Sequence, residues 1–317
     1  METGRTMIVD NAQKILTQLQ KVIVGKDSVL LWALATILAK GHILLEDIPG
    51  VGKTTMAVAF SKALGLSYNR VQFTPDVLPS DVTGYSVLNQ VTGTMEYRPG
   101  AVLCNLFLAD ELNRATSRTQ SALLEAMEER QVTVDGVTHS VPTPFIVIAT
   151  QNPAGAAGTQ LLPDSQIDRF MVSLSLGYPD PKDEVTMLLQ RQGRDPLQAL
   201  QPVVTTEELT AMQQAVAQTY VSEEIAAYMV ALVDATRRSP LLLRGASPRA
   251  TLSLASIAKA IASLRGRDYV VPKDVQECFV TALSHRLQTS AEAEGKDMDI
   301  TRALHTVMSS VPAPKLR

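Results

Sequence analysis

The spacing of apolar residues alternates between a helical repeat and short continuous runs over the first half of the chain. Apolar positions at helical spacing cover residues 8–40, with a break at 24–27, and predict two helices. Short apolar runs separated by helical segments predict strands of a parallel sheet covered on both faces. Five such strands are expected, at residues 43–45, 68–73, 102–109, 145–150 and 171–176.

Two further segments predict antiparallel hairpins outside that sheet. Residues 74–100 are rich in Pro, Gly, Asp and Thr and contain short alternating pieces, which indicates a hairpin inserted within or beside a helix. Residues 131–141 alternate around Asp135-Gly136, a strong two-residue turn signal. A strongly periodic helix, residues 116–130, lies between the two hairpins.

The second half of the chain is helical almost throughout. A Pro- and Gly-containing segment at 177–181 predicts a domain linker. The sequence therefore predicts an α/β domain over residues 1–178 and a smaller all-α domain over residues 179–317. The expected helices cover residues 183–192, 207–218, 223–238, 248–264 and 273–286, with a shorter one at 300–308.

The composition argues against a nucleic-acid-binding or membrane-spanning protein. The formal net charge is −3, so there is no general basic surface for nucleic acid. Hydrophobic residues make up 45% of the 317 positions, which is ample for packed cores. No apolar run approaches the roughly 20 residues of a membrane helix, and no apolar signal core follows the N-terminus. Cys104 and Cys278 are far apart in apolar contexts, as expected of buried reduced thiols in a cytoplasmic protein.

The segment from Asp47 to Thr55 predicts a phosphate-binding loop. It follows an apolar strand and leads into a helix, the setting in which a Gly-rich turn ending in Gly-Lys-Thr holds a nucleoside triphosphate. Gly50 and Gly52 let backbone N–H groups face an anion without interference from Cβ. The residues expected to contact nucleotide here are Pro49, Gly50, Val51, Gly52, Lys53, Thr54 and Thr55.

Each side chain of the loop has an expected role. Lys53 is expected to reach the β- and γ-phosphates of ATP, and the Thr54 hydroxyl to bind Mg²⁺. Asp47 stands where the usual pattern has its first glycine. Since a carboxylate beside phosphates is unfavourable, we expect the Asp47 side chain to point outward.

Polar residues at the ends of two other strands extend this site. Asp110 and Glu111 follow an apolar strand, as in a Walker B motif, at the edge where ligands bind in open α/β sheets. Asp110 is expected to hold magnesium through water, and Glu111 to orient and polarise the attacking water. Asn152 ends the next strand, where it would bond the γ-phosphate or the water; the alternative is a turn residue before Pro153.

Taken in order, these motifs resemble those of MoxR-type AAA+ ATPases. The match is ordered and extends over most of the chain, from about Val24 to the second domain; together these motifs are specific, although none is alone. They are LEDIPGVGKT (45–54), DELNRA (110–115), ALLEAMEE (122–129), ATQNP (149–153), LPDSQIDRF (162–170) and GASPRA (245–250).

The resemblance implies roles for further residues. Asn152 resembles the sensor-1 residue, and Arg169 the arginine finger offered to the nucleotide of a neighbouring subunit. Arg249 resembles sensor-2 on a lid helix, where it would help two domains close around ATP. Val24 and Gly25 match the segment that lines the adenine pocket. The pattern alone favours a plainer interpretation, in which Arg169 is an exposed arginine of a helix and Arg249 a helix-start arginine in a weak surface ion pair.

The two hairpins resemble the helix-2 insert and the pre-sensor-1 hairpin, which face the pore of such rings. The resemblance implies a homo-oligomeric ring, expected to be a hexamer, that uses ATP and Mg²⁺ and releases ADP. It also implies a chaperone-like remodeller or cofactor-insertion motor with a protein client and a separate VWA-domain partner. The roles of Arg114 and of the first 20 residues stay open.

Three alternatives remain at this point. A metal-chelatase motor subunit has a similar core. A nucleic-acid motor would carry basic hairpin tips, whereas the hairpin at 74–100 carries Asp76, Asp81 and Glu96 with Arg98, a poor set for binding phosphates. A nucleotide-gated scaffold would bind ATP and barely hydrolyse it, which the intact Asp110-Glu111 pair argues against.

Overall fold

A five-stranded parallel sheet forms the centre of the molecule. The structure is a computed structural model that describes residues 2–151, 162–190, 192 and 195–315. The strand order β2-β5-β8-β1-β9, with every pair parallel, confirms the predicted sheet. Its strands are β1 (Ile43–Glu46), β2 (Tyr68–Gln72), β5 (Leu106–Asp110), β8 (Ile146–Gln151) and β9 (Val172–Leu174).

Apolar side chains alternate between the two faces of this sheet. Ile43 and Leu45 belong to one buried cluster, while Leu44 belongs to the other. Both faces are therefore covered, which explains why the strands read as continuous apolar runs. The first cluster includes residues of α1 (Glu2–Gln20), α2 (Asp27–Leu38) and α3 (Lys53–Ala63); the second includes residues of α5 (Ser117–Glu129).

The third predicted strand begins later than expected. Residues 102–105 form a turn, and β5 starts at Leu106. Val102 and Cys104 are nevertheless buried, so the apolar run reflected burial and not extended backbone. Asp110 is the last residue of the strand, and Glu111 follows in the left-handed region with φ of 56°.

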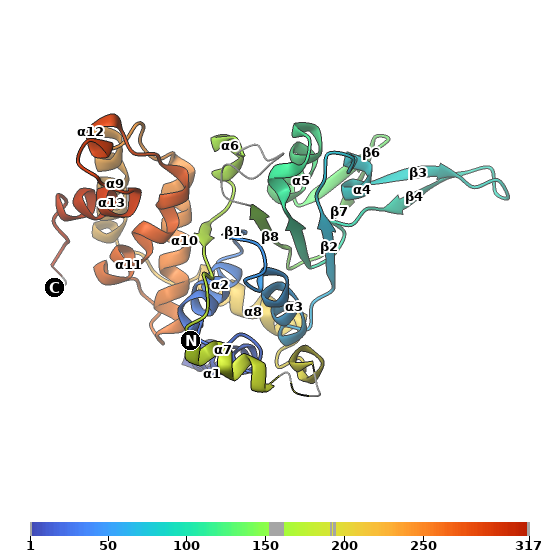
Figure 1. Cartoon of the computed structure of the whole chain (residues 1–317), viewed down its shortest axis with the longest axis horizontal. Coiled ribbons are helices and arrows are strands. Elements are labelled where there is room, and N and C mark those ends of the chain that lie inside the picture. The colour runs from blue at the N-terminus through green and yellow to red at the C-terminus, as the bar shows by residue number, and fades with distance from the viewer. Residues whose placement is uncertain (1, 152–161, 191, 193–194, 316–317) are drawn as a thin grey trace.

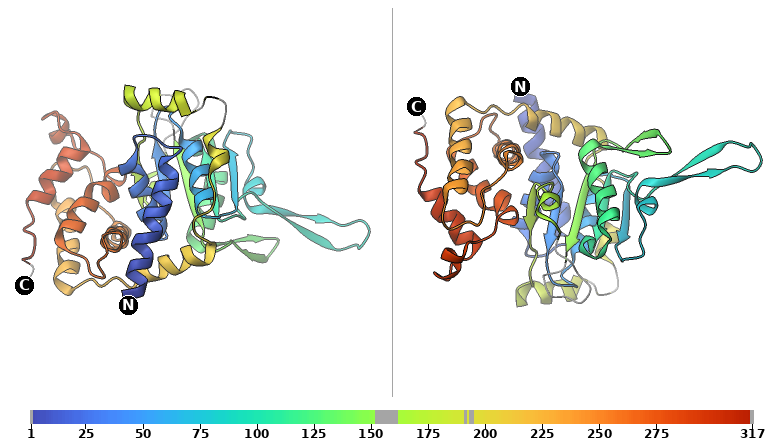
Figure 2. Two further views of the ribbon diagram at one scale, coloured as in Figure 1. Left: turned by 90° about the horizontal axis from the view of Figure 1, so that it is seen from below. Right: turned by 90° about the horizontal axis from the view of Figure 1, so that it is seen from above.

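Both predicted hairpins are present and lie on the same side of the molecule (Figures 1 and 2). The first follows α4 (Pro79–Thr83) and extends far from the rest of the chain. Its Tyr97 ring stacks on His139 of the second hairpin, with ring centroids 3.7 Å apart. Their strands are β3 (Gly84–Leu88), β4 (Met95–Pro99), β6 (Gln131–Val134) and β7 (Val137–Ser140).

The second half is helical, as predicted. Helices α8, α9, α10 and α13 are each preceded by an N-cap residue whose side chain accepts a hydrogen bond from the first turn: Thr205, Ser222, Ser247 and Asp299. Periodicity gave no sign of α6 (Asp164–Ile167) or α12 (Ala291–Glu294), since four residues are too few. The longer helices are α7 (Pro181–Gln190), α8 (Thr206–Ala217), α9 (Glu223–Arg238), α10 (Pro248–Leu264), α11 (Pro272–Leu283) and α13 (Ile300–Ser309).

One buried cluster continues from the sheet through α1 and α2 into α10 and α11. Cys278 lies within it and Cys104 in the cluster on the opposite face, both as buried free thiols. Among the residues that the structure describes, no helix has the length and apolar character needed to cross a membrane.

Candidate functional site

A cavity of about 680 Å³ opens at the carboxyl ends of the strands. Residues 49–55 form its floor, and Asp110 and Glu111 line one wall. Tyr178 and Met187, from the linker and α7, line the opposite wall. The structure therefore brings together the predicted phosphate loop and the predicted carboxylates.

The loop has the backbone conformation that its glycines predict. Gly50 and Gly52 have φ of 88° and 99°, a region that L side chains rarely adopt. Gly52 directly precedes the N-terminus of α3, whose first N–H groups are available to an anion. The Lys53 ammonium donates to the Asp47 carbonyl at 2.7 Å. Burial lowers the pKa of Lys53 below its usual value, while nearby carboxylates oppose the shift.

The expectation for Asp47 was wrong. Its side chain is buried and does not point outward. The carboxylate accepts hydrogen bonds from the Ser175 hydroxyl at 2.9 Å and from the backbone N–H groups of Leu176 and Gly177. The Asp47 carboxylate is thereby directed away from the phosphate position, and it ties the start of the loop to the segment that follows β9.

A smaller apolar cavity adjoins the loop where a base is expected. Val24 lines it together with Val51 and Leu176. Gly25 has φ of 70°, and a Cβ at this position would collide with the Asp183 carboxylate of α7. Its positive φ therefore favours glycine at this position, beside a cavity whose apolar lining suits a flat ring.

Asp110 and Glu111 are held by a residue that the sequence did not single out. The Thr150 hydroxyl donates to Asp110 Oδ1 at 2.7 Å and accepts from the Glu111 backbone N–H at 2.8 Å. Arg114 donates to Glu111 Oε2 at 2.8 Å, one of the contacts left open for this arginine. Thr150 is the penultimate residue of β8, so the neighbouring strand fixes the spacing of the two carboxylates.

Arg70 is a second pocket residue that the sequence did not predict. It lies on β2, lines the cavity, and donates to Asp110 Oδ2 from Nη2 at 2.7 Å and from Nε at 3.2 Å. A guanidinium thus balances the charge of the carboxylate expected to hold metal. The only sequence signal was a charged residue in the middle of a short, partly exposed strand.

The oxygen donors of this pocket fit a magnesium ion. Mg²⁺ is bound in proteins by carboxylate and hydroxyl oxygens together with waters. Thr54 and Asp110 supply such oxygens within one cavity. The site of Asn152 lies outside the described residues, so its predicted role stays a prediction.

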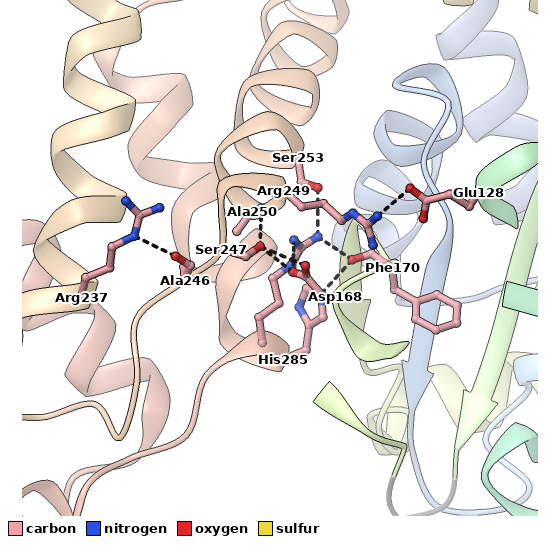
Figure 3. Close-up of polar contacts among 11 residues, drawn as sticks. Glu128, Asp168, Phe170, Arg237, Ala246, Ser247, Arg249, Ala250, Ser253 and His285 are labelled. Carbon is pink, nitrogen blue, oxygen red and sulfur yellow. Dashed lines mark hydrogen bonds and ion pairs between the residues drawn. The ribbon is translucent and has the colours of Figure 1, made fainter. Parts of the chain in front are cut away.

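The two predicted arginines lie together, away from this cavity. Arg169 Nη1 is 3.3 Å from Glu128 Oε2 and donates to the Leu124 carbonyl at 2.6 Å. Arg249 Nη2 donates to Glu128 Oε1 at 2.6 Å (Figure 3). Neither arginine is among the described residues that line the cavity of residues 49–55. Arg249 therefore does not close over the nucleotide site of its own chain in this structure.

A polar network joins the helical half to the sheet beside these arginines (Figure 3). The buried Arg286 donates to Asp168 at 2.8 Å and to the Phe170 carbonyl at 2.7 Å. Ser247 caps α10 and also donates to Asp168 at 2.9 Å. Burial lowers the pKa of Arg286 to about 10, and the Asp168 carboxylate opposes this shift.

The fold and the pocket define a nucleoside-triphosphate-binding protein of the AAA+ class, and comparison with known proteins agrees with this class. The family model for the ATPase family associated with various cellular activities matches residues 42–172, and the AAA lid domain model matches residues 234–304. A crystal structure of a candidate ATPase from Cytophaga hutchinsonii superposes with a TM-score of 0.90 and 35% identity, covering 99% of this chain and 98% of that one.

Two relatives that match nearly the whole of this chain indicate which family of AAA+ ATPases it belongs to. Chaperone MoxR1 of Mycobacterium tuberculosis is 37% identical over 99% of this chain and 85% of its own length. The uncharacterised protein YeaC of Bacillus subtilis is 44% identical over 96% of this chain and 95% of its own. The chain belongs to the MoxR family of AAA+ ATPases, and its reaction is the hydrolysis of ATP.

Proposed function

We propose that this chain forms a Mg²⁺-dependent ring, most simply a hexamer, whose active sites are shared between neighbouring copies. The observation that carries the proposal is the separation, within one chain, of the cavity from the Arg169–Arg249 pair. Head-to-tail packing brings two different faces of identical chains together and closes into a ring when the rotation permits. One copy then supplies the pocket and the next supplies the arginines.

Within the pocket each residue has a defined task. Lys53 binds the β- and γ-phosphates, and Thr54 and Asp110 hold Mg²⁺, which offsets charge on the phosphates. Glu111 orients the attacking water, and Asn152 bonds the γ-phosphate or that water. Arg169 and Arg249 of the next copy stabilise the charge that develops on the transferred phosphoryl group.

We further propose that hydrolysis remodels a protein client, or inserts a cofactor into it, with a separate VWA-domain partner. The name chaperone belongs to the MoxR1 relative and supports a protein substrate here. The projecting hairpin supports it as well, since Tyr85, Leu88, Val91 and Met95 are exposed on it. These apolar side chains suit a protein surface better than a nucleic-acid backbone.

The test is the ATPase rate per subunit against protein concentration, for wild type and for Arg169→Ala. The rate is expected to rise with concentration, and the variant to lose at least about 100-fold, since an arginine supplied in trans contributes that much or more. Arg302→Ala, an exposed arginine of α13, is the matched control and keeps the wild-type rate. A rate that is independent of concentration and unchanged by Arg169→Ala rules out shared sites.

A further inference from the structure

Glu128 joins the two arginines through one carboxylate. Its Oε1 accepts from Arg249 and its Oε2 pairs with Arg169, so three separate elements meet there. Arg169 precedes β9, Arg249 is the second residue of α10, and Glu128 lies near the end of α5. Glu128 and Arg169 both belong to the α/β half, and Arg249 reaches them because the helical half is docked on the sheet.

The charges of Glu128 and Arg249 are not explained by the stability of the helices that carry them. Glu128 lies in the last turn of α5, where the helix dipole disfavours a negative charge. Arg249 lies in the first turn of α10, where the dipole disfavours a positive charge. Both residues oppose the preference of their own helix, and residues that break local rules tend to mark functional sites.

The charges around Glu128 leave an excess of positive charge. Two guanidinium groups share one carboxylate, and the nearby Asp168 is already engaged by the buried Arg286 and by Ser247. Each guanidinium carries five N–H donors. One carboxylate oxygen cannot accept hydrogen bonds from all of them, so each arginine keeps donors for another acceptor. With 30% and 39% of their side chains exposed, Arg169 and Arg249 are within reach of an anion from outside.

We propose that Glu128 is a positioning residue that holds Arg169 and Arg249 side by side, as one bidentate receptor for the γ-phosphate bound by the next copy. This inference rests on the proposed shared sites. A long arginine side chain at the surface samples many rotamers, and fixing it beforehand removes that entropy from the transition state. The Asp168–Arg286 network holds the backbone on both sides of the receptor, and Glu128 fixes the two side chains.

The test mixes variants that lack different halves of the site. Lys53→Ala removes the pocket and keeps the arginines, whereas Arg169→Ala keeps the pocket and lacks an arginine. Each is inactive alone, and an equal mixture is expected to recover roughly a quarter of the wild-type rate, because half the pockets that remain face an intact neighbour. Failure of this mixture overturns the shared site itself.

Glu128→Ala is then expected to impair the same half of the shared site as Arg169→Ala, with a smaller loss of rate because both arginines are still present. Alone it lowers kcat roughly tenfold with little change in the KM for ATP, since misplacing the groups that meet the transition state lowers the rate. Mixing it with Lys53→Ala restores activity, and mixing it with Arg169→Ala does not. Glu128→Gln, which keeps one acceptor oxygen, falls between wild type and Glu128→Ala.

Glu129→Ala, one position along the same exposed surface, is the matched control and keeps the wild-type rate. Suppose the mixture of Lys53→Ala and Arg169→Ala recovers. The inference about Glu128 is then overturned if Glu128→Ala is fully active alone. It is equally overturned if Glu128→Ala is inactive and Lys53→Ala does not rescue it.

Discussion

The phosphate pocket and the arginine cluster at Glu128 are built in opposite ways. The pocket is concave and takes its floor from one contiguous segment, residues 49–55, whose glycines fix the backbone. The cluster consists of single side chains from distant elements, held by charge at a partly exposed surface. One region presents N–H donors and carboxylates around a cavity, and the other presents guanidinium groups outward. The proposed shared site would join these two regions, the pocket of one copy and the cluster of the next, into one catalytic centre.

The largest expected effect comes from the pocket half. Glu111→Gln removes the charge that is proposed to polarise the attacking water and keeps the shape of the side chain. We expect ATP hydrolysis to fall by about 100-fold or more, with ATP binding retained, since positioning and charge stabilisation carry phosphoryl transfer. Single-turnover hydrolysis and equilibrium binding of a fluorescent ATP analogue separate the two quantities.

A carboxylate remote from the pocket gives the control for this change. Glu292→Gln alters an exposed ion pair with Lys296 in the helical half. Its hydrolysis rate should match wild type. Hydrolysis by Glu111→Gln at the wild-type rate would remove Glu111 from the reaction and leave the pocket as a binding site only.

A smaller effect, on stability, is expected where the cluster meets the helical half. Asp168→Asn leaves the buried Arg286 guanidinium without a charged partner, and the Arg286 side chain is only 2% exposed. Breaking such a pair from one side costs about 3 kcal/mol in the free energy of unfolding. Urea denaturation measures it at pH 7.

Asp234→Asn is the matched substitution, because Asp234 pairs with Arg238 on the exposed face of α9. It should change the free energy of unfolding by less than about 1 kcal/mol. Equal losses in the two variants would show that Asp168 does not secure the helical half to the sheet. The cluster would then need another support.

The sequence predicted the pocket far better than the cluster. Lys53 and Thr54 belong to a contiguous motif, so their neighbours in space are also their neighbours in sequence. Arg70 and Thr150 meet Asp110 only through the order of the strands, which no local pattern encodes. Glu128 was missed as a partner for the same reason, since it reads as an ordinary exposed residue of a periodic helix.

The errors have similar causes. Asp47 was judged only against the phosphates beside it, whereas its hydrogen-bond donors lie at residues 175–177, far along the chain. The strand at 102–109 was extended too far because Val102 and Cys104 are buried in a turn. Apolar content reports burial directly and backbone conformation only indirectly.

The smallest effect of any single residue is the share of one buried histidine in a dependence of stability on pH, and each of the two regions contains such a histidine. His42 directly precedes β1, and its Nδ1 accepts from the Val147 N–H of β8 at 2.9 Å. His285 lies where the helical half meets the sheet, with Nε2 3.0 Å from the Phe170 carbonyl oxygen. Burial lowers the pKa of each to about 3, and a nearby arginine adds to the shift. In the unfolded chain a histidine has a pKa near 6.5.

Below about pH 6.5 the unfolded chain therefore binds protons that the folded chain does not, so stability falls as the pH is lowered towards 3. Each histidine contributes up to about 1.4 kcal/mol per pH unit in this window. Urea titrations at pH 7, 6 and 5 should show the loss, and His42→Asn and His285→Asn should each reduce its slope, whereas His305→Asn, on the exposed face of α13, should not. If only His285→Asn flattens the curve, acid acts on the junction that supports the arginines; if only His42→Asn does, it acts on the sheet that supports the pocket. Equal stability at pH 7 and pH 5 would contradict the expectation for both.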